Sequence, residues 1–192
     1  MIKFAVLVRH GESISNTMGI VSDDIDKYPL SEKGIKQARF VGNELKKINV
    51  DGILTSPILR ARHTAEIISS VLQKEIKIDQ RLREIGFGRF NNGPFSITPK
   101  FTYESDEIEA WTDIEKRMLS VMNDYNGNLI LVSHAFPIRV IIAHFLNLDE
   151  NESFGISLGN ASISVIDIIN KKVLAIGSPI ITENLMKSLK EK

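Results

Sequence analysis

Runs of apolar, β-branched residues alternate along the chain with segments whose apolar residues recur every three or four positions. Runs of the first kind are typical of strands buried on both faces, and the second spacing is typical of helices that bury one face. The predicted strands are Lys3–Val8, Gly52–Thr55, Ile76–Ile78 and Asn128–Ser133, followed by a hairpin of Ala161–Ile169 and Lys172–Ile176. The predicted helices are Ser31–Ile48, Leu59–Gln73, Asp106–Asp124 and Pro137–Leu146, and Glu183–Lys192 is either a short helix or a frayed tail.

This alternation predicts an α/β fold, a three-layer α/β/α sandwich with a mostly parallel central sheet and an antiparallel edge hairpin. Asn91–Glu104 contains two prolines and is predicted to be a loop. We therefore expect residues 1–192 to form a single domain that carries a small lid at about 85–105.

Composition then narrows the functional classes. The 24 Lys and Arg balance the 24 Asp and Glu, and without a basic run the chain is a poor partner for nucleic acid. The absence of cysteine excludes a disulfide scaffold, a thiolate metal site and a cysteine nucleophile. The apolar start ends at Arg9, too early for a secretory signal, and no stretch approaches the roughly 18 apolar residues that span a bilayer. We expect a cytoplasmic protein with no membrane partner, and the neutral charge is compatible with a homodimer.

Three polar clusters follow predicted parallel strands. They are Arg9-His10-Gly11-Glu12, the segment from Ser56-Pro57 through Arg60, and Ser133-His134. Because ligands of such sheets bind beyond the carboxyl ends of the strands, we expect the clusters to meet at one edge.

Together the clusters predict a site for a dianionic phosphoryl group. Arginine presents a planar fork of donors that matches phosphate oxygens, and a neutral imidazole such as that of His10 can attack phosphorus. Glu84 could complete the site by protonating the leaving oxygen. Taken singly, each residue is also explained as part of a loop, a solvated surface or the core, and on spacing alone Glu84 is better explained as a surface residue.

Five segments, in order, resemble the histidine phosphatase superfamily, the phosphoglycerate-mutase-like proteins. They are Leu7-Val8-Arg9-His10-Gly11-Glu12-Ser13 with Asn16, Pro29–Gly34 with Gln37-Ala38, Ser56–Ala61 with Thr64-Ala65, Leu82-Arg83-Glu84 with Gly88, and Ser133-His134. Asn160-Ala161-Ser162 is similar to a late-strand feature of phosphatase members. The match spans nearly the whole chain.

The resemblance implies roles for individual residues. The implied catalytic residues are Arg9, His10, Arg60, Glu84 and His134, and the implied substrate-binding residues are Arg9, His10, Asn16, Arg60, His134 and Ala135. His10 would become a phosphohistidine, Glu84 would act first as acid and then as base, and Gly11 would permit close approach. No metal or other cofactor is implied, because the arginines and a protonated His134 would supply the positive charge.

The chain also departs from the mutase members of that family. Ile85–Gly88, which follows Glu84, is uncharged, and the Thr17–Tyr28 loop is acidic. The candidates for a second cationic pocket, which are Arg81, Arg83, Arg89 and Lys100, are scattered. These features favour a metal-independent hydrolase of small phosphomonoesters that acts through a phosphohistidine. The alternatives are a cofactor-dependent phosphoglycerate mutase and a non-catalytic phosphate- or phosphoprotein-binding module.

Two further histidines have no assigned role. His63 lies one turn after Arg60 on the same predicted helix and could touch the site. His144 falls in an apolar helix and is predicted to be a buried structural histidine.

Overall fold

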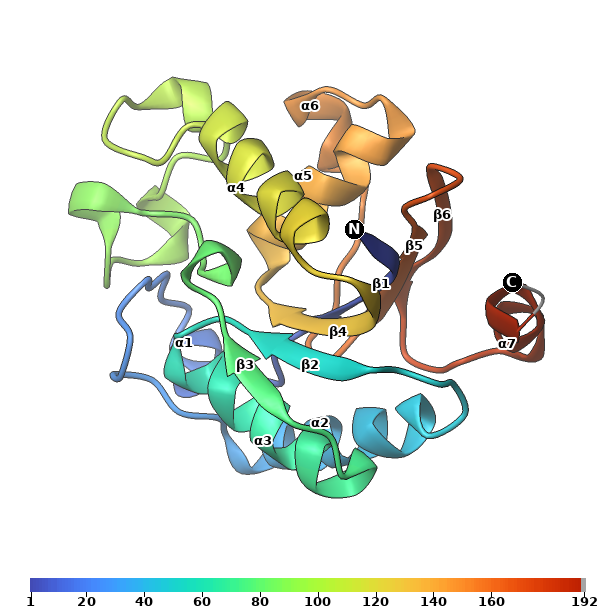
Figure 1. Cartoon of the computed structure of the whole chain (residues 1–192). Coiled ribbons are helices and arrows are strands. Elements are labelled where there is room, and N and C mark those ends of the chain that lie inside the picture. The colour runs from blue at the N-terminus through green and yellow to red at the C-terminus, as the bar shows by residue number, and fades with distance from the viewer. Residues whose placement is uncertain (191–192) are drawn as a thin grey trace.

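A computed structural model describes residues 1–190 of the chain, and in this part the strands form one six-stranded sheet in the order β3-β2-β4-β1-β5-β6 (Figure 1). The strands are β1 (Ile2–Arg9), β2 (Gly52–Thr55), β3 (Ile76–Ile78), β4 (Gly127–Ser133), β5 (Ile163–Asp167) and β6 (Lys172–Ser178). The first four in the order pair in parallel, whereas β5 runs antiparallel to β1 and β6 antiparallel to β5. The predicted mostly parallel sheet with an antiparallel edge hairpin is confirmed.

Helices cover both faces of the sheet, with α2 and α3 on one side and α4 and α5 on the other (Figure 1). The α-helices are α1 (Ile14–Thr17), α2 (Glu32–Leu45), α3 (Leu59–Leu72), α4 (Trp111–Asp124), α5 (Ala135–Leu146), α6 (Glu150–Ser153) and α7 (Glu183–Lys190). Short 3₁₀ turns are η1 (Gln80–Leu82), η2 (Gly88–Phe90), η3 (Phe95–Ile97) and η4 (Thr102–Glu104). The last two residues of the predicted C-terminal segment, Glu191 and Lys192, lie outside the described residues.

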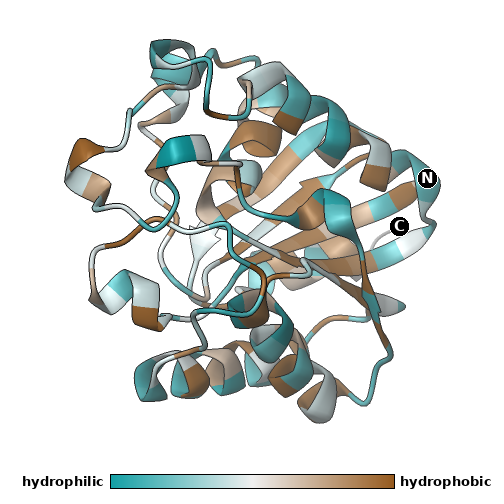
Figure 2. Cartoon of the chain, turned by 90° about the vertical axis from the view of Figure 1, so that its left-hand side faces the viewer, coloured by the Kyte–Doolittle hydropathy of each residue, from teal (hydrophilic) through white to brown (hydrophobic). Residues whose placement is uncertain are grey.

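The alternation of side chains along β1 divides the core into two clusters. Val6 and Val8 pack with the residues of α2 and α3, whereas Ala5 and Leu7 pack with those of α4 and α5. Because both faces are covered, the strand is apolar at nearly every position, which explains the continuous apolar run in the sequence. Figure 2 shows this as largely brown strands between helices banded in brown and teal.

The starts of two helices differ from the predictions. The prediction that a helix begins at Asp106 is wrong, because α4 begins at Trp111. The backbone of Glu109 is held by the carbonyl of Gly86, 2.9 Å away, and Ala110 is extended, so a tertiary contact overrides the acidic helix start. By contrast, α5 begins two residues earlier than predicted, with Pro137 in its first turn, where no N–H donor is required.

None of the helices in residues 1–190 combines the length and the apolar character that a bilayer crossing requires.

Candidate active site

The clusters predicted to meet at the edge of the sheet do so at the ends of β1, β4 and β2, which are neighbours in the sheet. The ring centroids of His10 and His134 are 5.1 Å apart, and Arg60 Nε lies 3.1 Å from His10 Nε2. His10 and Arg60 border a cavity of about 650 Å³. The predicted residues that line this cavity are Arg9, His10, Asn16, Arg60, Glu84 and Ala135. His134 does not line the cavity itself and packs behind His10 with no exposed surface.

His10 is fixed through its backbone and through both ring nitrogens. Its N–H donates to Ser133 O (3.0 Å), and its carbonyl accepts from Ala161 N (3.0 Å). Its Nδ1 lies 2.7 Å from Gly11 O, and a carbonyl can only accept, so the proton is on Nδ1. Nε2 is then the unprotonated nitrogen and accepts from Arg60 Nε. Burial, followed by the charge of Arg60, holds the pKa of His10 well below 6.5, so the ring is neutral and nucleophilic.

The loop that carries His10 is anchored on the start of α2. A Cβ on Gly11 would lie 2.5 Å from the carbonyl oxygen of Gly34, so the close approach at Gly11 is to this backbone. The Glu12 carboxylate accepts from Ser31 Oγ (2.8 Å) and from Lys33 Nζ (2.9 Å). The structure therefore gives Gly11 a role in positioning the loop on α2.

The two predicted arginines present buried N–H groups that have no acceptor. Arg60, in the first turn of α3, donates from Nη2 to Ser22 O (2.8 Å), and Arg9 donates from Nη1 to Leu158 O (2.6 Å). Within the described residues, Arg60 Nη1 and Arg9 Nε find no hydrogen-bond partner. A buried donor left unpaired costs about 1–3 kcal/mol, and more when it is charged, so both groups are suited to an anion from outside the chain.

The surroundings of His134 determine its protonation. Its Nε2 lies 2.8 Å from Ser56 Oγ, and its Nδ1 makes no hydrogen bond and lies 3.8 Å from Glu84 Oε2. Burial, and then the charge of Arg60, lowers the pKa of His134 well below 6.5. In this arrangement of the site the ring is therefore neutral, and a protonated His134 stays a prediction for the substrate-bound site.

Glu84 is buried rather than on the surface, although its spacing in the sequence favours the surface. Its side chain lines the cavity, and Oε1 accepts from Ile85 N (3.0 Å). Burial raises the pKa of Glu84, and the charges of Arg60 and Arg9 oppose this rise. The carboxyl group therefore keeps its proton to a higher pH than an ordinary glutamate does.

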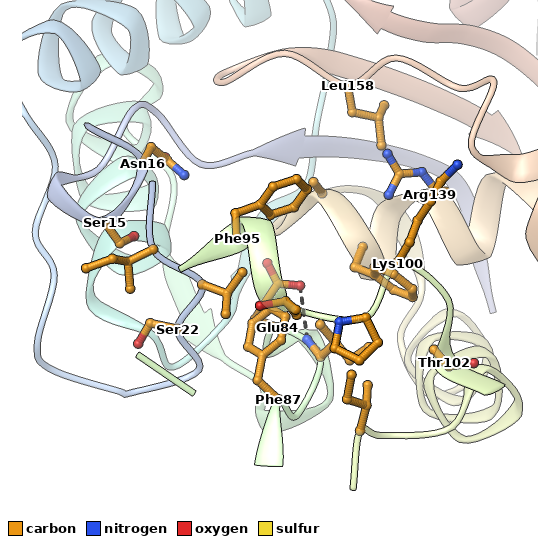
Figure 3. Close-up of a pocket in the computed structure, with 18 of the residues that line it drawn as sticks. Ser15, Asn16, Ser22, Glu84, Phe87, Phe95, Lys100, Thr102, Arg139 and Leu158 are labelled. Atoms are coloured by element: carbon orange, nitrogen blue, oxygen red, sulfur yellow. Dashed lines mark hydrogen bonds between the residues drawn. The ribbon is translucent and has the colours of Figure 1, made fainter. Parts of the chain in front are cut away.

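Asn16 and Ala135 line the cavity with polar groups that remain free to donate. Asn16 Oδ1 accepts from Ser13 N (3.0 Å) and Asn160 Nδ2 (3.1 Å), which leaves its amide nitrogen directed toward the cavity (Figure 3). Ala135 is the first residue of α5, where backbone N–H groups lack an intrahelical acceptor and favour an anion.

Some residues of the site were not assigned from the sequence. Thr64 Oγ1 accepts from Gly11 N (3.1 Å) and donates to Arg60 O (2.8 Å), so it ties the nucleophile loop to α3. Arg139 lines the cavity as well, and so does Lys100, which the sequence offered as one of four scattered candidates for a second cationic pocket. The signal for Arg139 was its position four residues after Ala135, which puts both on one face of α5.

The acids of loop 17–28 bind a neighbouring segment of the chain. Asp24 accepts from Nδ2 of Asn91 (2.9 Å) and of Asn92 (2.8 Å), which connects this loop to segment 85–105. Asp24 does not line the cavity. The structure therefore gives Asp24 a role in joining loop 17–28 to segment 85–105.

The remaining candidates lie away from the cavity. The three arginines proposed for a second cationic pocket are paired with acids, as Arg81–Asp79, Arg83–Glu109 and Arg89–Glu107. His63 does not line the cavity. His144 is exposed and lies 2.8 Å from Glu115, so its predicted burial is wrong.

The chain is similar to known proteins over nearly its whole length. Residues 5–176 match the model of the histidine phosphatase superfamily (branch 1). The chain is 41% identical to a 2,3-bisphosphoglycerate-dependent phosphoglycerate mutase of Thermoplasma acidophilum, over 97% of this chain and 98% of that protein. Phosphoserine phosphatase of Entamoeba histolytica, solved with 3-phosphoglyceric acid, is similar in structure, with a TM-score of 0.78 and 25% identity over 95% of this chain and 98% of that one. YhfR of Bacillus stearothermophilus shares the fold, with a TM-score of 0.80 and 24% identity over 91% of this chain and 96% of that one.

Proposed function

Because the chain belongs to the histidine phosphatase superfamily, and is an enzyme of that type, we propose that it hydrolyses small phosphomonoesters through a phosphohistidine formed on His10. The proposed reaction uses no metal, because the guanidinium groups of Arg9 and Arg60 supply the positive charge that phosphoryl transfer requires.

One observation carries this proposal: a neutral, buried histidine lies beside arginine N–H groups that have no acceptor. His10 Nε2 is the unprotonated nitrogen, and Arg60 Nε already points at it. Arg60 Nη1 and Arg9 Nε are buried without a partner in residues 1–190. The oxygens of a phosphoryl group would satisfy both donors while its phosphorus faces Nε2.

In the first step, His10 Nε2 attacks phosphorus, and a P–N bond forms as the ester P–O bond breaks. Glu84, whose pKa is raised by burial, gives its proton to the leaving oxygen, so the alcohol departs uncharged. Arg60 transfers its Nε donor from His10 to a phosphoryl oxygen. A dianion bound at His10 would raise the pKa of the neighbouring His134, whose Nδ1 has no hydrogen-bond partner in residues 1–190, and the ring would then take up a proton from solvent and place positive charge near the phosphoryl group.

In the second step, water attacks the phosphohistidine while the ionised Glu84 takes its proton. The P–N bond breaks, and inorganic phosphate leaves with its negative charge held by the arginines. His10 returns to its neutral form and Glu84 to its acid form, so the cycle closes without any other reactant.

A specific observation also favours a phosphoglycerate mutase as the second candidate. The relative that is 41% identical bears that name, and Arg139 and Lys100 give the cavity cations beyond the phosphoryl site. A mutase returns the phosphoryl group to a sugar acid, so it must hold a doubly phosphorylated intermediate. The test supplies 3-phosphoglycerate with a trace of 2,3-bisphosphoglycerate and compares the phosphate released with the 2-phosphoglycerate formed. Faster isomerisation than phosphate release would select the mutase.

We also propose that residues 1–192 act as one domain in which segment 85–105 is a lid over the site. Backbone hydrogen bonds join this segment to loop 17–28, from Val21 N to Gly93 O (3.0 Å) and from Phe95 N to Gly19 O (2.8 Å). Phe95 lines the cavity and is 74% exposed, so this part of the segment lies between the cavity and solvent.

The experiment that tests the hydrolase assays phosphate release from a panel of phosphomonoesters with a chelator present. A rapid quench of the wild type with labelled substrate should trap a phosphoprotein that is labile to acid and stable to base, as a phosphohistidine is. Binding of phosphate esters without turnover of any of them would instead favour the non-catalytic binding module. A requirement for added Mg²⁺ or Zn²⁺ would contradict the proposed chemistry.

A further inference from the structure

The wall of the cavity across from Asn16 carries two cations that the proposed reaction does not use. Arg139 comes from α5, and Lys100 comes from the loop between η3 and η4. Figure 3 shows both on the far side of the cavity from Asn16, Ser15 and Ser22.

Arg139 is held against aromatic rings and is not neutralised. Its guanidinium carbon lies 4.6 Å from the ring centroid of Phe154 and 5.9 Å from that of Phe136. Its Nε is buried without a hydrogen-bond partner in residues 1–190, and Glu84 acts on it through charge alone. A guanidinium stacked on a ring keeps its in-plane N–H donors free for a planar anion.

Lys100 shares one of these rings. Its Nζ lies 4.8 Å from the ring centroid of Phe101 and 5.0 Å from that of Phe154, and no acid in the described part of the chain forms an ion pair with it. The Phe101 and Phe154 rings are themselves in edge contact, with centroids 5.0 Å apart. Both cations pack against aromatic faces and not against carboxylates, so their positive charge is not neutralised.

We propose that Arg139 and Lys100 form a second anion subsite, which binds the carboxylate of a substrate whose phosphoryl group lies at His10. This proposal rests on the proposed function. The substrate class is then a phosphorylated hydroxy acid or amino acid, and esters of neutral alcohols are poor substrates.

A comparison within the cavity favours a carboxylate over a second phosphate. The phosphoryl end faces the dianion with two guanidinium groups, Arg9 and Arg60. The wall across from Asn16 offers one guanidinium, Arg139, and the charge of Lys100 is screened by solvent because this side chain is exposed. One planar fork matches the two oxygens of a carboxylate and its single charge.

The experiment uses two substrates with the same carbon skeleton, 3-phosphoglycerate and glycerol 3-phosphate, in which only the carboxylate differs. Arg139→Met keeps an apolar stem on Phe154 and removes the charge. It should lower kcat/KM for 3-phosphoglycerate by about 10- to 100-fold, the loss of hydrogen bonds to a charged group. For glycerol 3-phosphate the change should stay within about threefold, and Arg139→Lys should recover part of the loss because it restores the charge without the fork.

Arg89→Met is the matched control. Arg89 is also stacked on a ring, with its guanidinium carbon 4.9 Å from the centroid of Phe90, but it lies outside the cavity. This variant should leave the ratio of kcat/KM for the two substrates unchanged. An equal loss on both substrates in Arg139→Met would overturn the subsite and make Arg139 a structural residue. If Arg139→Met lowers kcat/KM more for a bisphosphorylated diol than for 3-phosphoglycerate, the subsite binds a second phosphate and its assignment to a carboxylate is overturned.

A binding measurement separates this proposal from the proposed function. In the His10→Ala protein, calorimetry should show tighter binding of 3-phosphoglycerate than of glycerol 3-phosphate, and adding Arg139→Met should remove the difference. If the wild type turns over neither ester but the difference in binding is present, the hydrolase fails and the subsite stands. If turnover occurs and no difference in binding is found, the subsite fails and the hydrolase stands.

Discussion

The two ends of the cavity are built from different kinds of structure. The phosphoryl end follows the parallel strands β1, β2 and β4, and its histidines are buried and held by hydrogen bonds. The other end is made by Arg139 of α5, by segment 85–105 and by Phe154 after α6, and here cations rest on aromatic rings. Strand ends hold reacting atoms within narrow limits, whereas loops can change the shape of a pocket at little cost in stability. We therefore expect the chemistry to depend on the first end and the choice of substrate on the second.

The sharpest test of the phosphoryl end is His10→Ala. Turnover of every phosphomonoester should fall by at least about 10⁴-fold, because the acceptor of the phosphoryl group is lost. The labelled phosphoprotein should disappear as well. The melting temperature should stay close to that of the wild type, since the neighbouring backbone hydrogen bonds do not involve the ring. Substantial residual activity would show that His10 is not the nucleophile. It would also contradict the expectation that the chemistry depends on the phosphoryl end of the cavity.

Glu84→Gln should have the next largest effect, and one that depends on the leaving group. With alkyl phosphates the rate should fall by about 10²- to 10⁴-fold, because the leaving oxygen needs the proton of a general acid. An aryl phosphate leaves without that proton and should lose less. Equal losses on both kinds of ester would mean that Glu84 maintains the site instead of supplying a proton.

The pH profile of the wild type follows from the same residue and from His10. Activity should rise as the pH climbs through the lowered pKa of His10, because attack requires the neutral ring. It should fall as the pH passes the raised pKa of Glu84, because the first step requires the protonated carboxyl group. The falling limb should vanish in Glu84→Gln, which kcat/KM measured across pH would show.

Arg60→Ala should lower kcat by about 10²- to 10³-fold, the loss typical of one preorganised donor to developing negative charge. Arg60→Lys should restore only part of this, because an ammonium group cannot donate to His10 and to the phosphoryl oxygens as the fork does. A change confined to KM would show that Arg60 binds ground state and transition state equally.

The same division between the ends describes what the sequence could predict. The alternation of apolar runs identified the sheet and its covering helices, and consecutive motifs identified His10 and its neighbours at the strand ends. Arg139 was not identified, and Lys100 was named only as one of several scattered cations, because the two meet on Phe154 through tertiary packing. The protonation of His134 and Glu84 depends on burial, which motifs do not encode.

The start of α4 shows the same limit on a larger scale. Local charge favoured a helix from Asp106, but Glu109 pairs with Arg83 and Arg117, its N–H donates to Gly86 O, and the helix begins only at Trp111. Local sequence patterns therefore predict helices and strands well where tertiary packing agrees with them. They give the wrong boundary where a residue bonds to a partner that is distant in the sequence.

The smallest effect is expected from Asp24→Asn, which tests the connection between loop 17–28 and segment 85–105 at the second end of the cavity. The Asp24 carboxylate accepts hydrogen bonds from Asn92 and Asn91, which lower its pKa, so the connection between loop 17–28 and segment 85–105 is present at neutral pH and is lost as the pH falls through that lowered value. Since the Asp24 carboxylate is largely in water, the variant should raise KM by only about two- to fivefold and leave kcat unchanged. Proteases should cut segment 85–105 faster in the variant than in the wild type. Asp26→Asn is the matched control, because Asp26 pairs with Arg62 on α3 and not with the lid. If Asp26→Asn raises KM as much as Asp24→Asn does, the lid connection has no special part in binding, and the second end of the cavity is set by α5 alone.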